Sequence, residues 1–185
     1  MFGNFNYISI TDKTRINDEM TILRGRLFEF TPVGIEKQLE GLDDESISFL
    51  KSLPTFVCSE MESDGDGGSM VIKYGRIIDL KPSDLSVVIN FETLFDFGEM
   101  KFDSSQDAQR IFGIDNFQLY RGHWAVREGE STEVLRRLKG LSTEFSDKID
   151  ELMGQPKVGA EVEPPPRKKK ILGAATDVAS FLKLL

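Results

Sequence analysis

The segment MVIKYGRIIDLKPSDLSVVINF, residues 70–91, decides the fold that the sequence predicts. Its two apolar runs, 70–80 and 85–91, are rich in β-branched residues and are typical of strands. The KPSD stretch between them suits a turn, because Pro82 restricts φ at the second turn position and Asp or Ser side chains can bond nearby main chain. The segment therefore predicts a β-hairpin of two antiparallel strands.

Further short strands are expected on both sides of this hairpin. They are indicated by alternating or β-rich runs near residues 5–10, 55–59, 97–102 and 117–126. Gly122 is expected to kink the last of these, and residues 24–31 fit either a strand or the end of a helix that begins near Asp18. The turns are too short for crossover helices, so a mainly antiparallel sheet is expected.

Three helices are expected in the first 153 residues. One runs to about Ser52 from an N-cap at Asp43 or Asp44, and one covers 104–112 with Gly113 after its end. The longest, 131–153, is capped by Ser131 and carries an apolar stripe formed by Val134, Leu135, Leu138, Leu141, Phe145, Ile149 and Leu152. Gly140 could break it, with Ser142 capping a second helix.

The remaining residues predict a tail outside this globular part. Residues 154–170 (GQPKVGAEVEPPPRKKK) contain almost no side chains suited to burial, and the run of three prolines at 164–166 favours an extended linker. Residues 171–185 then predict a short amphipathic helix whose apolar face is formed by Ile171, Leu172, Ala175, Val178, Phe181, Leu182 and Leu185. An isolated helix of about 15 residues is marginal in water, so this face is expected to need a binding surface.

The predicted fold class is therefore α+β: a mainly antiparallel sheet packed by a long C-terminal helix, then a Pro-rich linker and a short amphipathic helix. The expected parts are a globular domain at 1–153, a Pro/Lys-rich linker at 154–170 and a docking helix at 171–185.

Charge and cysteine content indicate an intracellular protein. Cys58 is the one cysteine among 185 residues, so no intrachain disulfide can form and a reducing cytoplasm is expected. No signal peptide and no run of about 20 apolar residues is recognisable, so no transmembrane segment is expected. The net charge of -8 is carried by residues 1–160, since residues 161–185 hold five Lys and Arg against three Asp and Glu. General nucleic-acid binding by the acidic domain is therefore disfavoured.

One cluster could carry chemistry. Arg121, His123 and Arg127 bring the one histidine of the sequence beside two cations, which could bind a phosphorylated or carboxylated small molecule with a carboxylate such as Glu60 or Asp79. The alternative interpretation, which we favour, is a structural histidine and arginines that pair with abundant carboxylates, because no nucleophile is identifiable.

The other motifs do not predict a cofactor or a metal. The acidic stretch 60–69 fails the EF-hand spacing, because a loop that starts at Asp64 puts Gly75 where a bidentate Glu belongs. Its glycines lack the Lys-Ser/Thr of a phosphate-binding loop and the helix that follows a dinucleotide loop. Cys58 lies beside Glu60, so a buried, inert thiol is expected.

Two functions remain. The leading hypothesis is a non-enzymatic interaction or regulatory module that docks its tethered C-terminal helix on a partner protein through Ile171, Leu172, Val178, Phe181, Leu182 and Leu185. The alternative is an enzyme or ligand-binding domain for an anionic small molecule that uses Arg121, His123 and Arg127. Homo-oligomerisation is compatible with both.

Overall fold

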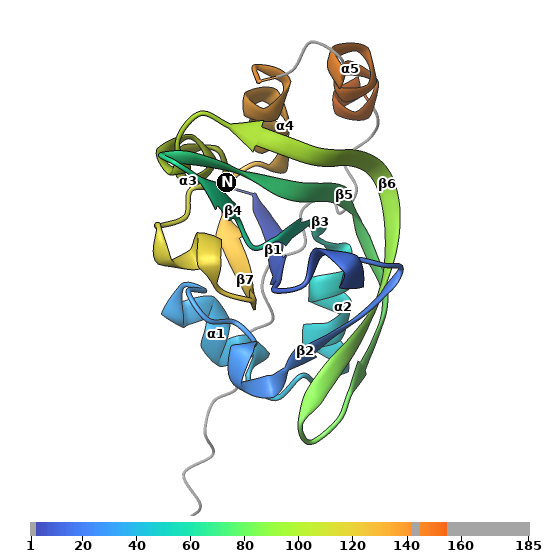
Figure 1. Ribbon diagram of the computed structural model, residues 1–185. Helices are drawn as coiled ribbons and strands as arrows, with labels where there is room; N and C mark the ends of the chain where they lie inside the picture. The colour runs from blue at the N-terminus through green and yellow to red at the C-terminus, as the bar shows by residue number, and fades with distance from the viewer. Residues whose placement is uncertain (1–2, 142–144, 155–185) are drawn as a thin grey trace, which may run out of the picture.

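The computed structural model describes residues 3–141 and 145–154. Their strands form one mixed seven-stranded sheet that curves into a half-barrel (Figure 1). The strands are β1 (Asn4–Ile10), β2 (Glu19–Leu23), β3 (Pro54–Ser59), β4 (Glu62–Asp64), β5 (Gly67–Pro82), β6 (Ser86–Phe102) and β7 (His123–Glu128). Their order is β2-β6-β5-β3-β1-β7, and β4 pairs with β5.

The hairpin predicted from residues 70–91 is present as β5 and β6, but both strands are longer than expected. The predicted strands 85–91 and 97–102 are one continuous strand, β6. Register shifts at Ile72/Lys73, Tyr74/Gly75 and Ile77/Asp79 interrupt the β5–β6 pairing. Bulges of this kind bend and twist a strand pair, which lets these two long strands curve around the molecule (Figure 1).

The predicted fold class is wrong in two respects. First, the sheet is mixed, because β1 and β3 are parallel while the other described strand pairs are antiparallel. The connection between β1 and β3 contains β2, α1 (Val33–Leu39) and α2 (Asp44–Ser52), so it is long enough to cross over. Second, no long helix among residues 131–141 and 145–154 packs the sheet.

The stretch expected to form that helix contains two short ones. They are α4 (Ser131–Lys139) and α5 (Ser146–Gly154), and α4 ends at Gly140, where the sequence had left a break open. Ser131 is the first helical residue of α4, and Glu130 takes the N-cap position predicted for Ser131. Both helices bury apolar side chains in the core, Leu138 from α4 and Ile149 from α5 among them.

Locally capped helices were predicted well. Asp43 caps α2 by accepting a hydrogen bond from the Ser46 main-chain N–H at 2.9 Å. Ser104 caps α3 (Ser105–Phe112), and Gly113 ends it with φ of 66° in the left-handed region that glycine tolerates. The predicted strand at 117–126 is instead the 3-10 helix η3 (Phe117–Tyr120) followed by β7.

Two apolar cores lie on the two sides of the curved sheet. One contains Phe56, Met70 and Phe97 with side chains from α3, α4 and α5. The other contains Ile8, Ile89 and Trp124 with side chains from α1 and α2. In Figure 1, α4 and α5 lie over one end of the long strands β5 and β6, and α2 lies inside the curve of the other end.

None of the helices within residues 3–141 and 145–154 is long and apolar enough to cross a membrane. Gly154, the first residue of the linker predicted for 154–170, is the last residue of α5. The rest of that linker and the docking helix predicted for 171–185 lie outside the described residues.

Candidate functional site

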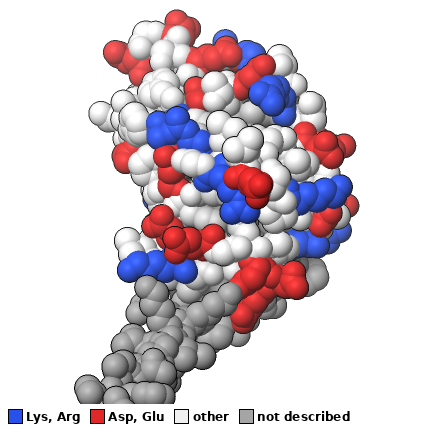
Figure 2. Space-filling model, turned by 90° about the horizontal axis from the view of Figure 1, so that it is seen from below, with Lys and Arg blue, Asp and Glu red and all other residues white. Residues whose placement is uncertain are grey.

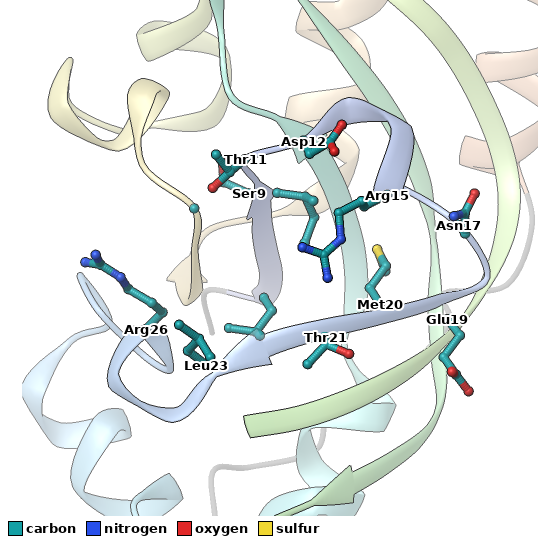
Figure 3. A pocket seen from close by; sticks show the side chains of 13 residues that line it. Ser9, Thr11, Asp12, Arg15, Asn17, Glu19, Met20, Thr21, Leu23 and Arg26 are labelled. Carbon is teal, nitrogen blue, oxygen red and sulfur yellow. The ribbon is translucent and has the colours of Figure 1, made fainter. Parts of the chain in front are cut away.

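A groove opens between the outer edge of β2 and the end of β1 (Figure 3). Its volume is about 490 Å³. The 3-10 helix η1 (Lys13–Arg15) connects the two strands and forms part of the wall. The lining side chains and main-chain groups belong to Ser9, Ile10, Thr11, Asp12, Arg15, Asn17, Glu19, Met20, Thr21, Ile22, Leu23, Arg26 and Gly122.

The strand β2 is the last in the sheet order and pairs only with β6 among the described strands. The main-chain hydrogen bonds from Phe91 N to Asp18 O at 2.7 Å and from Arg24 N to Leu85 O at 2.9 Å mark both ends of this pairing. In an antiparallel ladder, the residues that bond to the partner alternate with residues whose main chain points away. The N–H and C=O groups of Glu19, Thr21 and Leu23 therefore face outward.

The two arginines that line the groove differ in their ion pairing. Arg26 contacts Glu29 at 3.4 Å, whereas Arg15 has no carboxylate within 4.0 Å among the described residues. The nearby Asp12 carboxylate accepts from the main-chain N–H of Thr14 at 2.9 Å and from its hydroxyl at 2.7 Å, and these bonds lower the pKa of Asp12. Figure 3 shows the Arg15 side chain in the space between Ser9 and Met20.

The structure does not gather Arg121, His123 and Arg127 on one open surface. Arg121 makes a bidentate contact with Glu29, at 2.9 Å and 2.7 Å, and its guanidinium lies 5.1 Å from the Phe117 ring centre. Arg127 donates to the main-chain carbonyls of Phe30 and Gly113.

The carboxylates suggested for that cluster are also held elsewhere. Glu60 accepts from the Thr11 hydroxyl at 2.8 Å, and Asp79 lies on β5, which β3 and β1 separate from β7. The acidic stretch 60–69 forms β4, a turn and the start of β5, with Glu62 paired to Lys13 at 2.9 Å. These contacts do not favour the anionic-ligand alternative.

His123 is fully buried between aromatic rings. Its ring centre lies 5.6 Å from that of Tyr7 and 5.1 Å from that of Phe30. The Nδ1 atom is 2.6 Å from the Arg121 carbonyl, which can only accept, so Nδ1 carries the proton. Nε2 is then a buried acceptor with no partner among the described residues. Burial, followed by the nearby positive charge of Arg127, lowers the pKa of His123 from 6.5 to about 4.

Cys58, Ser9 and His123 stand side by side on β3, β1 and β7. The burial expected for Cys58 is confirmed, and it raises the pKa of the thiol well above its ordinary value. The Tyr7 hydroxyl lies near this thiol. Neither the Tyr7 hydroxyl nor the Ser9 hydroxyl makes a hydrogen bond of normal geometry to a described residue. The Cys58 thiol therefore stays protonated and the His123 imidazole stays neutral at neutral pH.

The buried imidazole predicts acid sensitivity. Because the folded-state pKa of about 4 lies below the ordinary 6.5, the unfolded chain binds more protons in this window. Stability from His123 is therefore complete above about pH 6.5 and is lost as pH falls toward 4. We expect a loss of about 2 to 3 kcal/mol at 1.36 kcal/mol per pKa unit.

Urea unfolding at a series of pH values measures this loss. In His123→Asn, an amide can still donate to the Arg121 carbonyl but has no charge to gain, so its stability should fall less between pH 6.5 and 4. Equal pH dependence of the two proteins would contradict the expected role of His123.

Sequence reasoning missed the groove. The alternation of Glu19, Met20, Thr21 and Ile22 was a readable strand signal, and their burial alternates as a half-buried strand requires. The free edge of this strand depends on the sheet order and has no local signal.

Comparison with known proteins adds no assignment: no family model, no curated protein and no solved structure matches the chain.

On the face seen in Figure 2, Lys and Arg side chains lie among Asp and Glu side chains and do not gather into one patch.

Proposed function

We propose that the protein is a non-catalytic, cytoplasmic interaction module that docks residues 171–185 on a partner protein. The sequence pattern of this segment supports the proposal, because apolar residues recur at the spacing of one helix face: Ile171, Leu172, Val178, Phe181, Leu182 and Leu185. A helix of this kind binds by laying its apolar face into a groove on another protein.

The observation that carries the proposal is that the described domain already covers both faces of its sheet. Side chains of α1 and α2 fill one core, and side chains of α3, α4 and α5 fill the other. The apolar residues of 171–185 are therefore not needed to close either core. A surface outside this domain is the better partner for them.

A matched pair of substitutions in the full-length protein tests the proposal. Phe181→Glu places a charge on the apolar face, whereas the neighbouring Ser180→Glu places the same charge on the polar side. Partners captured by cross-linking and mass spectrometry should be lost with Phe181→Glu, by about tenfold or more, because burying an unpaired carboxylate costs at least about 1.4 kcal/mol. They should be retained with Ser180→Glu.

Deletion of residues 171–185 provides the second measurement. Capture that survives both the deletion and Phe181→Glu would exclude this segment as the docking element. Capture lost equally with Phe181→Glu and Ser180→Glu would also contradict the proposal, because it would not depend on the apolar face.

A further inference from the structure

The groove along β2 is a second candidate surface, formed by residues other than 171–185. Its lining includes the largely buried side chains of Ile10, Met20 and Ile22. The outward main-chain groups of Glu19, Thr21 and Leu23 belong to the same lining. Unpaired strand edges of this kind bind an extended peptide as an added strand, in which main-chain hydrogen bonds give affinity and side-chain contacts give specificity.

The shape of the groove selects the kind of occupant. On the side opposite β2, the end of β1 and the helix η1 form a wall that contributes Thr11, Asp12 and Arg15 to the lining (Figure 3). A single extended chain fits between two such walls. The sheet edge of a second folded copy would bring further strands and helices against η1, so a dimer through β2 is disfavoured.

The charge in the groove selects the chemistry of the occupant. Arg15 is exposed, has no carboxylate within 4.0 Å among the described residues, and points into the groove. Arg26, at the other end, is already paired with Glu29. A carboxylate that enters beside Arg15 would meet a guanidinium that has no carboxylate within 4.0 Å among the described residues, since the nearby Asp12 carboxylate is bonded to Thr14. The neighbours of the entering carboxylate would meet the exposed Leu23 side chain and the small accessible parts of Met20 and Ile22.

We infer that this groove binds an extended segment of a partner protein that carries an aspartate or glutamate between apolar residues. The segment adds a strand to β2, its main chain pairs with Glu19, Thr21 and Leu23, and its carboxylate pairs with Arg15.

Selection from a random peptide-display library on the full-length protein tests this inference. Binding peptides should be enriched in Asp or Glu flanked by apolar residues. Loss of the pairing guanidinium in Arg15→Gln should weaken binding of a selected peptide by about tenfold or more, because hydrogen bonds to charged groups are stronger than neutral ones. The control Lys13→Gln alters a neighbouring cation that already pairs with Glu62, and it should leave the affinity nearly unchanged.

The main-chain pairing is tested separately. Thr21→Pro removes an N–H that faces the groove and that the pairing of β2 with β6 does not use, so the fold should tolerate it while peptide binding falls by about tenfold or more. The control Thr21→Ala keeps the N–H and should bind normally. Methylating alternate main-chain nitrogens of the selected peptide makes the same test without changing the protein.

Four results would overturn the inference. The library could yield no binding peptides, or peptides that bind the Arg15→Gln and Thr21→Pro proteins as tightly as the original. Light scattering could show a dimer that Thr21→Pro dissociates, which would make a second copy the occupant. Peptide binding could appear only after deletion of residues 155–185, which would make the chain's own tail the occupant. Loss of capture with Phe181→Glu leaves these measurements unaffected, so the two proposals fail independently.

Discussion

Replacing Asn6 by leucine is expected to lower the free energy of unfolding by about 3 to 5 kcal/mol, because it breaks a buried hydrogen-bond network. The Asn6 amide donates to the Leu50 carbonyl at 2.9 Å and to the Thr55 hydroxyl at 3.0 Å. Its oxygen accepts from the Trp124 indole N–H at 3.1 Å. Asn6 and Trp124 are fully buried, so the polar groups that lose Asn6 as a partner cannot form hydrogen bonds with water instead.

The same network explains the expected size of the effect. Leu50 is near the end of α2, Thr55 is on β3 and Trp124 is on β7, so one side chain on β1 links the strands on both sides of β1 and a helix. Each buried polar group that loses its partner costs about 1 to 3 kcal/mol. Leucine has as many side-chain heavy atoms as asparagine but bulkier methyl groups, so overpacking at this buried site adds to the loss.

Urea unfolding at neutral pH measures the change, and two variants serve as controls. Asn4→Leu makes the same exchange on the same strand at a partly exposed position, and it should change stability by no more than about 0.5 kcal/mol, as is usual for surface sites. Trp124→Phe removes one donor only and should cost about 1 to 3 kcal/mol for the unpaired oxygen and the smaller ring. Equal stabilities of Asn6→Leu and Asn4→Leu would show that the network contributes nothing.

The sequence predicted those parts of the fold whose signals are local. The β5–β6 hairpin follows from the KPSD turn, and α2 and α3 follow from the caps Asp43 and Ser104. Each of these signals lies within a few residues of the element it starts or ends. The residues that interact are close in the sequence, so these interactions do not depend on the rest of the sheet.

The parts that were missed depend on distant partners. The parallel pairing of β1 with β3 joins residues that α1, α2 and β2 separate in the sequence, and no pattern in either strand specifies it. Residues 92–96 read as an interruption between two strands, but pairing with β5 holds β6 continuous across bulges. The sequence predicted one helix at 131–153 because the apolar stripe continues past Gly140. In the structure α4 ends there, since glycine weakens a helix interior.

The candidate sites show the same limit. Arg121, His123 and Arg127 are close in the sequence, but their partners Glu29 and Phe30 are more than 90 residues away. The segment that carries these partners pairs with β7 through a bridge between Leu27 and Trp124. Residue types alone indicated a structural histidine and paired arginines, but they could not identify the partners that these contacts provide.

Replacing Gly75 by alanine is expected to cost about 2 to 4 kcal/mol, because β5 and β6 approach too closely there for any side chain. A Cβ atom at this position would lie 1.9 Å from the Glu92 main-chain oxygen and 2.8 Å from Cζ of Phe91. Gly75 follows a register shift in the β5–β6 pairing, between Tyr74 in one core and Ile77 in the other. The main chain of β6 must therefore move, and the pairing that joins the two cores moves with it.

Gly41→Ala is the matched control for this last prediction. The same methyl group at position 41 meets nothing within 4 Å, and it should leave the free energy of unfolding within about 0.5 kcal/mol or raise it slightly by restricting the unfolded chain. Urea unfolding gives the stabilities, and amide exchange shows where protection is lost. We expect Gly75→Ala to expose β6 on both sides of residue 92, since the curvature of the half-barrel depends on this close approach. Unchanged protection and stability would mean that the long strands adapt their register freely, and that the bulges do not determine how the two cores are joined.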